Sequence, residues 1–278
     1  MQLVKLRLTL SVVLSSLLAY LIAGPAEFSW LALGILGTGG FLVTGASNAL
    51  NQVLERDYDR LMRRTADRPL ASGRMKTSEA VLAAGLMSMV GITLLALFNP
   101  WAAFFGMLAL ISYAFVYTPL KRVSPVAVVV GAVPGALPSL IGAVAAEGEL
   151  TLLGLTLFAI QFFWQFPHFW SIGWLGFADY QKAGYRLMPS LGESADPQVG
   201  RQAFLYTLFL LPLVLAPWGL GVVGMVSAGL ALALTVGYGW FAWKFQRALD
   251  RRSALQLMFY SFFYLPLVLL VFLVDKVM

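Results

Sequence analysis

The sequence contains no cysteine and only one histidine, His168. The lack of cysteine excludes disulfides, iron–sulfur clusters, thiolate zinc sites and haem attached through a CxxCH motif. Charge is also scarce, because charged residues make up 12% of the 278 residues, against roughly 25% in soluble domains. With 60% apolar residues and a mean hydropathy of +0.81, this composition excludes a soluble globular fold and predicts an integral membrane protein.

The apolar residues form nine runs, each close to the roughly 20 residues that a helix needs to cross a bilayer. We expect spans at residues 8–24, 29–49, 79–98, 101–118, 125–146, 151–176, 200–217, 219–243 and 255–274. The first run lacks the small-residue cleavage site of a signal peptide and is therefore interpreted as a span. The predicted fold is all-α, a polytopic bundle of about nine transmembrane helices that forms a single domain over residues 1–278.

The Lys and Arg residues predict the orientation of these spans. If the N-terminus is cytoplasmic, the inner loops contain all of the 19 Lys and Arg residues except Lys276. Positive charge concentrates in short cytoplasmic loops of membrane proteins, so this distribution supports both the span count and the orientation. The net charge of +6 is therefore a topology signal, and no basic domain indicates a nucleic-acid partner.

Polar side chains concentrate at the end of the second span, in the stretch NQVLERDYDRLMRRTADRP at 51–69. Asn51, Glu55 and Asp59 recur at every fourth residue, so a helix places their oxygen atoms on one face. Carboxylate and amide oxygens suit Mg²⁺, and the arginines that follow suit a phosphate group. The alternative is an ordinary basic loop with surface ion pairs. Carboxylates that continue from a membrane span need a cationic partner, which favours a functional site.

Two further segments carry polar groups. YTPLKR at 117–122 lies on the same predicted membrane side as the first cluster, although by itself it is typical of an ordinary span end. His168 lies among aromatic residues in the sixth span, where it is either a packed, hydrogen-bonded residue or a group that binds haem iron. Asp179 and Lys182, in the loop that follows, are candidates for a further metal ligand and a phosphate contact. The surrounding aromatic rings either pack or stabilise an allylic cation.

Five motifs together resemble the UbiA-type intramembrane prenyltransferase superfamily and, within it, the branch that farnesylates haem. They are N-xxx-E-xxx-D-xx-M-x-RT-xx-RP from Asn51, YTPLKR at 117–122, PGALP at 134–138, QFPHFW at 165–170 and DY-xx-AG-xxx-MP at 179–189. Two positions depart from the pattern: Glu55 stands where Asp is common, and Asp179 is followed at i+4 by Ala183 instead of a second acid.

The resemblance implies that haem B, farnesyl diphosphate and water react to give haem O and diphosphate, with haem B as a substrate. It implies Mg²⁺ as the cofactor, held by Asn51, Glu55 and Asp59 with Asp179 as a further ligand. The implied catalytic groups also include Arg64, Arg68, Lys121, Arg122, Asp179 and Lys182. The implied substrate-binding residues are Asn48, Tyr117, Trp164, His168 and Tyr180.

The resemblance further implies a multi-pass protein of a bacterial inner membrane whose active-site loops are cytoplasmic. Its expected partners are membrane lipid and either haem A synthase or a terminal oxidase. Two other functions remain open at this point. One is a prenyltransferase with an aromatic or quinone-precursor acceptor, which shares the first cluster. The other is a transporter or haem-binding scaffold, although transporters place their polar sites near the bilayer midplane.

Overall fold

The computed structural model describes residues 2–192 and 194–277. Nine helices within this described part are long and apolar enough to cross a membrane, which confirms the predicted number of spans and the all-α helical class. The chain divides into two compact units. Unit 1 comprises the described parts of Met1–Thr151 and Ala178–Leu187, and unit 2 those of Leu152–Phe177 and Met188–Met278. The single domain expected over 1–278 stays a prediction.

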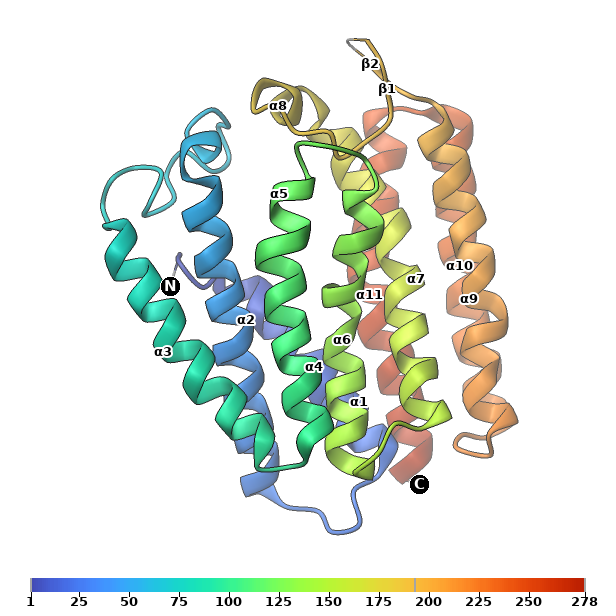
Figure 1. Cartoon of the computed structure of the whole chain (residues 1–278). Coiled ribbons are helices and arrows are strands. Elements are labelled where there is room, and N and C mark those ends of the chain that lie inside the picture. Colours follow the sequence, from blue (N-terminus) through green and yellow to red (C-terminus); the bar gives the residue numbers. More distant parts are fainter. Residues whose placement is uncertain (1, 193, 278) are drawn as a thin grey trace. The chain divides into compact units, whose positions relative to one another are not determined.

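Unit 1 contains most of the helices in the first half of the chain (Figure 1). They are α1 (Leu6–Ala23), α2 (Trp30–Asp59), α3 (Thr77–Ala96), α4 (Pro100–Ile111), the π-helix η1 (Ser112–Tyr117), α5 (Thr118–Leu120) and α6 (Ala127–Glu147). Helix α2 packs mainly against α3, and α1 packs mainly against α6. Most of α8 (Phe177–Lys182) also belongs to this unit.

Local sequence explains where these helices begin and end. The Ser29 hydroxyl accepts a hydrogen bond from the Ala32 amide and caps the start of α2, and Asn99 caps α4 in the same way through the Ala102 amide. Pro100 at the first position of α4 fits because that amide has no partner within the helix. Helix α6 ends at Gly148, whose positive φ of 81° glycine adopts without strain.

Helix α2 differs most from the span predicted at 29–49. It continues to Asp59, so Asn51, Glu55 and Asp59 all lie on the same continuous helix as the apolar residues before them. The connection between α2 and α3 is therefore shorter than the interval of 50–78 that separates the two predicted spans, and it consists mainly of turns. This extension carries the polar face beyond the apolar part of the span.

The contact between α1 and α6 depends on a residue without a side chain. A Cβ atom added at Gly142 of α6 would collide with the backbone carbonyl of Ser16 in α1. Small residues allow membrane helices to approach until their backbones touch, and van der Waals packing then holds them together. Gly142 is therefore required for the packing of the helix pair within unit 1.

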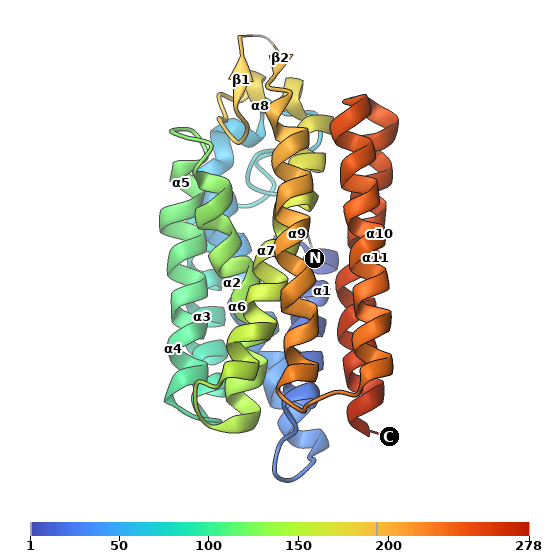
Figure 2. The same ribbon diagram turned by 90° about the vertical axis from the view of Figure 1, so that its right-hand side faces the viewer.

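Unit 2 is built from four long helices: α7 (Leu152–Leu175), α9 (Gln198–Gly219), α10 (Met225–Ala248) and α11 (Arg251–Val277). Each packs against two others in the cyclic order α7, α9, α10, α11, and Figure 2 shows α9, α10 and α11 running side by side. A short antiparallel hairpin of β1 (Ser190–Leu191) and β2 (Ser194–Ala195) precedes α9.

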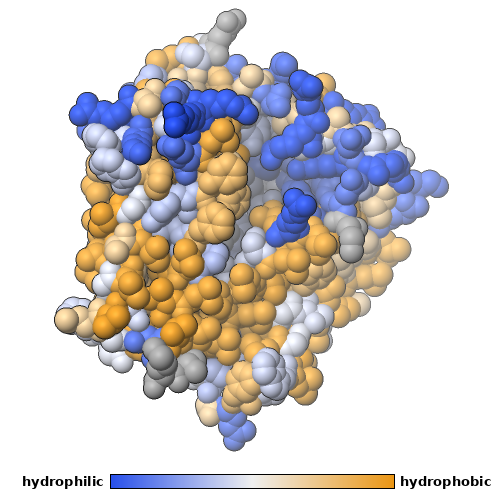
Figure 3. All heavy atoms as spheres, turned by 180° about the vertical axis from the view of Figure 1, so that it is seen from behind, coloured by the Kyte–Doolittle hydropathy of each residue, from blue (hydrophilic) through white to orange (hydrophobic). Residues whose placement is uncertain are grey.

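Many large apolar side chains are exposed, as expected of helices in lipid, where no hydrophobic effect drives them inward. Exposed examples are Trp30, Leu31 and Leu82 in unit 1 and Val226 and Phe263 in unit 2. The face drawn in Figure 3 is covered broadly by hydrophobic residues, with hydrophilic residues gathered mainly toward its upper edge. The chain is therefore an integral, multi-pass membrane protein.

Candidate active site

The polar face of α2 is buried within unit 1. Asn51, Glu55 and Asp59 have exposed fractions of 0%, 5% and 1%. The predicted four-residue spacing on one helix therefore holds, and the three side chains lie in sequence toward the end of α2. Ionised carboxylates at this depth require compensating charge.

Both carboxylates have basic partners. Lys121 Nζ donates to Glu55 Oε1 at 2.8 Å, and Arg68 Nη1 donates to both oxygens of Asp59 at 2.8 Å. The same guanidinium nitrogen lies 3.9 Å from Glu55 Oε2, so Arg68 links the two acids. These contacts bring four of the predicted catalytic residues into one cluster.

The loop after α2 positions Arg68 through its backbone. The buried Thr65 hydroxyl donates to the Asp59 carbonyl at 2.9 Å, and the Arg68 amide donates to the Thr65 carbonyl at 3.0 Å. The chain thereby folds back over the end of α2, so that the Arg68 guanidinium reaches the Asp59 carboxylate. The RT-xx-RP run seen in the sequence is therefore a structural requirement of the cluster.

The π-helix η1 positions the residues that come from the YTPLKR segment. Single π turns in helices often occur at functional sites, because they turn side chains toward a chosen face. The Thr118 hydroxyl donates to the Tyr113 carbonyl and accepts from Asn51 Nδ2 at 3.1 Å. One turn later, Lys121 reaches Glu55 and lies 4.5 Å from the centre of the Tyr117 ring.

The N-terminal segment before α1 forms another wall of the cluster. Lys5 Nζ donates to Asn51 Oδ1 at 2.8 Å. The Gln52 amide donates to the carbonyls of Gln2 and Leu3, and the Asn48 amide donates to the Val4 carbonyl and to Thr9 Oγ1 of α1, both at 3.3 Å. Asn48, predicted to bind substrate, is thus engaged in holding this segment against α2.

The charges in the cluster do not balance. Three basic side chains, Lys5, Arg68 and Lys121, face two acids, Glu55 and Asp59. Burial lowers the pKa of Lys5, and the charges of Arg68 and Lys121 lower it further. For Lys121, burial also acts to lower the pKa, but Glu55 outweighs it and the pKa is raised. An added anion would therefore relieve the repulsion among these three basic side chains.

Tyrosine side chains surround the cluster. Tyr185 packs with Met62 and Ala183, with Tyr58 and Tyr180 against them. Its buried hydroxyl has no partner in hydrogen-bond geometry among the described residues. Burial raises the pKa of this hydroxyl, and the carboxylates of Glu55 and Asp59 raise it further. A buried hydroxyl without a partner is costly, so it suits a ligand atom.

Two predicted phosphate-binding arginines lie on these tyrosines. Arg122 donates a hydrogen bond to the Tyr58 hydroxyl, and its guanidinium carbon is 4.3 Å from the Tyr58 ring centre. Arg64 Nη2 donates to the Tyr180 hydroxyl at 3.2 Å. The Arg186 amide donates to the Lys121 carbonyl at 2.7 Å, which fastens the segment after α8 to α5. Arg64, Arg122 and Tyr180 are therefore next to the cluster, with no direct contact to its carboxylates among the described residues.

The chemistry of the donor set fits Mg²⁺. Two carboxylates and one amide oxygen on a single helix face are hard donors of the kind that Mg²⁺ prefers. Among the described residues, no three or more Asp, Glu, His or Cys side chains are arranged so that they could hold a metal ion, so Asn51 and a phosphate would complete the set. Since each carboxylate already contacts a basic group, a divalent cation fits best together with an anion that engages Arg68 and Lys121.

Asp179 and Lys182 are less integrated than the sequence predicts. Asp179 is half-buried in α8 and Lys182 is exposed at its end. Among the described residues, Lys182 forms no ion pair with the carboxylates of α2, and Asp179 forms none with Arg68 or Lys121. Their assignments as a metal ligand and a phosphate contact stay predictions.

His168 and Trp164 belong to unit 2. His168 is buried, its Nδ1 lies 2.7 Å from the Ser261 hydroxyl, and its ring stacks on Trp164 with centres 5.1 Å apart. Trp164 Nε1 donates to the Ser261 carbonyl at 2.8 Å. These contacts match the packed, hydrogen-bonded interpretation of this histidine, and a role with haem stays a prediction.

Sequence reasoning did not select Lys5, Thr118, Tyr58 or Tyr185 as site residues. Tyr185 lies inside the AG-xxx-MP run, at 183–189, and Thr118 lies inside YTPLKR, so both were within motifs already singled out. Lys5 gave no signal beyond its predicted cytoplasmic position. Its role depends on a contact over 46 residues of sequence, which spacing does not reveal.

Fold and cluster together define a membrane-embedded helical protein with a buried, positively charged polar site. The chain belongs to the UbiA prenyltransferase family, whose sequence pattern matches residues 12–265. A relative from Cytophaga hutchinsonii, named protoheme IX farnesyltransferase, is 40% identical over 277 residues, covering 99% of this chain and 96% of the relative.

Solved structures share the fold. A digeranylgeranylglyceryl phosphate synthase structure has a TM-score of 0.80 at 18% identity and covers 99% of this chain and 96% of its own. A UbiA homologue from Archaeoglobus fulgidus bound to GPP and Mg²⁺ has a TM-score of 0.68 at 16% identity, covering 98% of this chain and 99% of its own.

Proposed function

We propose that this family member transfers a farnesyl group from farnesyl diphosphate to a vinyl group of haem B, with addition of water. The products are haem O and diphosphate. The observation that carries the proposal is the buried cluster in which three basic groups face two carboxylates. The naming of a relative that is 40% identical over nearly the whole chain supports the choice of donor and acceptor.

Binding of the diphosphate end follows from the charges. Lys5, Arg68 and Lys121 repel one another in the substrate-free cluster. An anion that enters the cluster attracts all three and offsets this repulsion. Mg²⁺, held by Asn51, Glu55 and Asp59, would neutralise charge on the leaving diphosphate. Its use is supported by the donor set and by the Mg²⁺ in the A. fulgidus homologue structure.

The basic side chains also favour the reaction itself. As the bond between carbon and the diphosphate oxygen breaks, negative charge grows on the leaving group. Arg68 and Lys121 are held by hydrogen bonds before substrate arrives, so little reorganisation is needed when that charge appears. Arg64 and Arg122, anchored on Tyr180 and Tyr58, extend the basic surface beside the cluster.

Aromatic side chains protect the reactive carbon. Tyr58, Tyr180 and Tyr185 pack with Met62 beside the carboxylates, and this apolar wall excludes water from an allylic cation. Tyr117 already presents its ring to the Lys121 ammonium, which shows that this ring face accepts a positive charge. The haem vinyl group attacks the farnesyl carbon as the bond from that carbon to the diphosphate oxygen breaks. Water then adds to the resulting cation, and the proton that the water releases passes to diphosphate or to solvent.

Location and partners follow from the same proposal. The positive-inside distribution supports a cytoplasmic position for the cluster, and the bacterial relatives support an inner-membrane location. Haem O then passes to haem A synthase or to a terminal oxidase. His168 and Trp164 would bind the haem, and Asp179 and Lys182 would complete the phosphate end.

The test is an incubation of membranes that contain the protein with haem B, farnesyl diphosphate and Mg²⁺, followed by chromatography and mass analysis of the extracted haems. We expect a new haem heavier by farnesyl plus water, and none when EDTA is present. A prenylated quinone precursor in place of prenylated haem, when both acceptors are offered, would overturn the acceptor. Product formation that EDTA leaves unchanged would overturn the role of Mg²⁺.

A further inference from the structure

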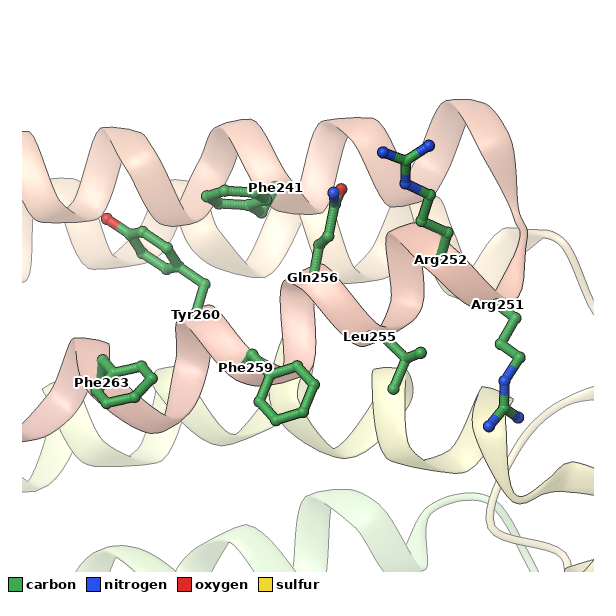
Figure 4. A pocket seen from close by; sticks show the side chains of 8 residues that line it. All are labelled: Phe241, Arg251, Arg252, Leu255, Gln256, Phe259, Tyr260 and Phe263. Atoms are coloured by element: carbon green, nitrogen blue, oxygen red, sulfur yellow. The ribbon is translucent and has the colours of Figure 1, made fainter.

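A groove of about 700 Å³ runs along α11 in unit 2 (Figure 4). Seven of its eight lining residues come from the first half of α11, and Phe241 of α10 lies across from them. Figure 4 shows Leu255, Phe259 and Phe263 along one flank, with Gln256 and Tyr260 nearer to α10. The groove lies apart in sequence from every residue of the candidate active site.

One end of this groove is basic. Arg251 and Arg252 are both exposed, and their guanidinium groups point to opposite flanks of α11. No ion pair with an acid is found for either arginine among the described residues. The neighbouring Asp250 is engaged with the helix start, because its Oδ1 accepts from the Ser253 amide and hydroxyl. Two positive charges are therefore available at this end.

The length of the groove matches one leaflet of a bilayer. From Arg251 to Phe263 the helix advances 12 residues, or about 18 Å at 1.5 Å per residue. Half of a hydrocarbon core of about 30 Å is roughly 15 Å. A chain that starts at the arginines and follows Leu255, Phe259 and Phe263 would thus reach about the bilayer midplane.

The groove is too open for a buried substrate. Phe259 and Phe263 are 56% and 66% exposed, whereas ligand pockets typically enclose some 70–90% of a bound small molecule. Among the described residues that line the groove, Phe241 alone comes from a helix other than α11. This shape suits a flexible chain that keeps one side in contact with other lipids, with its charged end fixed.

We propose that this groove binds one anionic phospholipid. The headgroup phosphate is bound by Arg251, on the flank of Leu255, Phe259 and Phe263, and one acyl chain follows these three residues, while Arg252 adds positive charge from the other flank. Guanidinium groups bind phosphate through paired N–H donors, and basic pockets between membrane helices on the cytoplasmic side recognise anionic headgroups. The site is a lipid-binding site that is separate from prenyl transfer.

The experiment is native mass spectrometry of the full-length protein in detergent, titrated with phosphatidylglycerol or with phosphatidylcholine of the same chains. We expect one phosphatidylglycerol to be retained in preference. The double variant Arg251→Gln/Arg252→Gln should weaken its apparent affinity by about tenfold or more. The matched control Arg201→Gln, an exposed arginine at the start of α9 outside the groove, should leave the affinity unchanged.

A second comparison tests the acyl chain and needs no mutation. Phosphatidylglycerol with six-carbon chains should bind the wild-type protein clearly more weakly than the long-chain lipid. The proposal would be overturned if phosphatidylcholine were retained as well as phosphatidylglycerol. It would also be overturned if short-chain phosphatidylglycerol or inorganic phosphate bound as tightly as the long-chain lipid. Displacement of the lipid from the wild-type groove by haem B or by farnesyl diphosphate would also overturn it, and would assign the groove to a substrate.

Discussion

At the scale of single residues, Asp59 is the most stringent test of the active site. Asp59→Asn removes one of the two buried carboxylates and leaves Arg68 without its strongest partner. We expect haem farnesylation to fall by at least about a hundredfold, because both metal binding and the placement of Arg68 depend on this charge. The rate of haem O formation in membranes with equal amounts of protein measures the effect.

Asp57 provides the matched control on the same helix. Its side chain is 65% exposed, and within the described part of the chain its ion pairs are with the neighbouring Arg56 and Arg60. Asp57→Asn should therefore keep the activity within about twofold, since exposed ion pairs contribute little. A similar loss in both variants would show that general damage to α2, and not the buried carboxylate, explains the result.

The Tyr185 hydroxyl leads to a prediction with opposite effects on stability and binding. Tyr185→Phe removes a buried hydroxyl that has no partner, so the substrate-free protein should become more stable by about 1 kcal/mol. If the hydroxyl donates to the diphosphate, affinity for farnesyl diphosphate should fall roughly tenfold. Thermal unfolding in detergent and isoprenoid titration measure the two effects.

Tyr58→Phe is the control for this pair of effects. The Tyr58 hydroxyl accepts from Arg122, so its removal should lower the stability instead of raising it. A loss of stability in Tyr185→Phe as well would mean that its hydroxyl is already satisfied by Glu55, and the proposed contact with substrate would be wrong.

At the scale of helices, the close approach of α1 and α6 makes Gly142 sensitive to substitution. Gly142→Ala places a methyl group against the Ser16 carbonyl, and we expect a loss of about 1–3 kcal/mol in stability. Gly85→Ala in α3, where an added Cβ meets nothing within 4 Å, should be neutral or slightly stabilising. Equal midpoints of thermal unfolding for the two variants would contradict the packing argument.

The helices also show how far sequence reasoning reaches. Hydropathy predicted all nine spans, because a helix that crosses a bilayer needs about 20 mostly apolar residues, and such runs can be read directly from the sequence. It misplaced the end of α2 by ten residues, since hydropathy falls at Asn51 while the helix continues to Asp59. The four-residue spacing of Asn51, Glu55 and Asp59 predicted that they share one face of a helix, and that prediction agrees with the structure.

The partners of that face were beyond the sequence. Lys121 and Arg68 were expected among the catalytic groups, but their pairing with Glu55 and Asp59 depends on how η1 and the loop after α2 turn back. Lys5 was missed because a lysine before a first span is ordinary topology. The unpaired hydroxyl of Tyr185 is visible only once the packing around it is known.

At the scale of the whole molecule, the orientation can be tested because the chain has no cysteine. Single cysteines introduced at the exposed positions Ser72 and Glu149 provide one reporter in the loop after α2 and one beyond α6. In intact cells, a membrane-impermeant maleimide should label Glu149→Cys and not Ser72→Cys. Disruption of the membrane should make both reactive, and the reverse pattern in intact cells would overturn the cytoplasmic active site.

The hydrogen bonds between α2 and residues 2–5 have a practical consequence for anyone who purifies the protein. Backbone carbonyls of Gln2, Leu3 and Val4 and the side chain of Lys5 all engage α2 beside the carboxylates. An affinity tag fused directly before these residues would disturb these hydrogen bonds and, through them, the helix that carries Asn51 and Glu55.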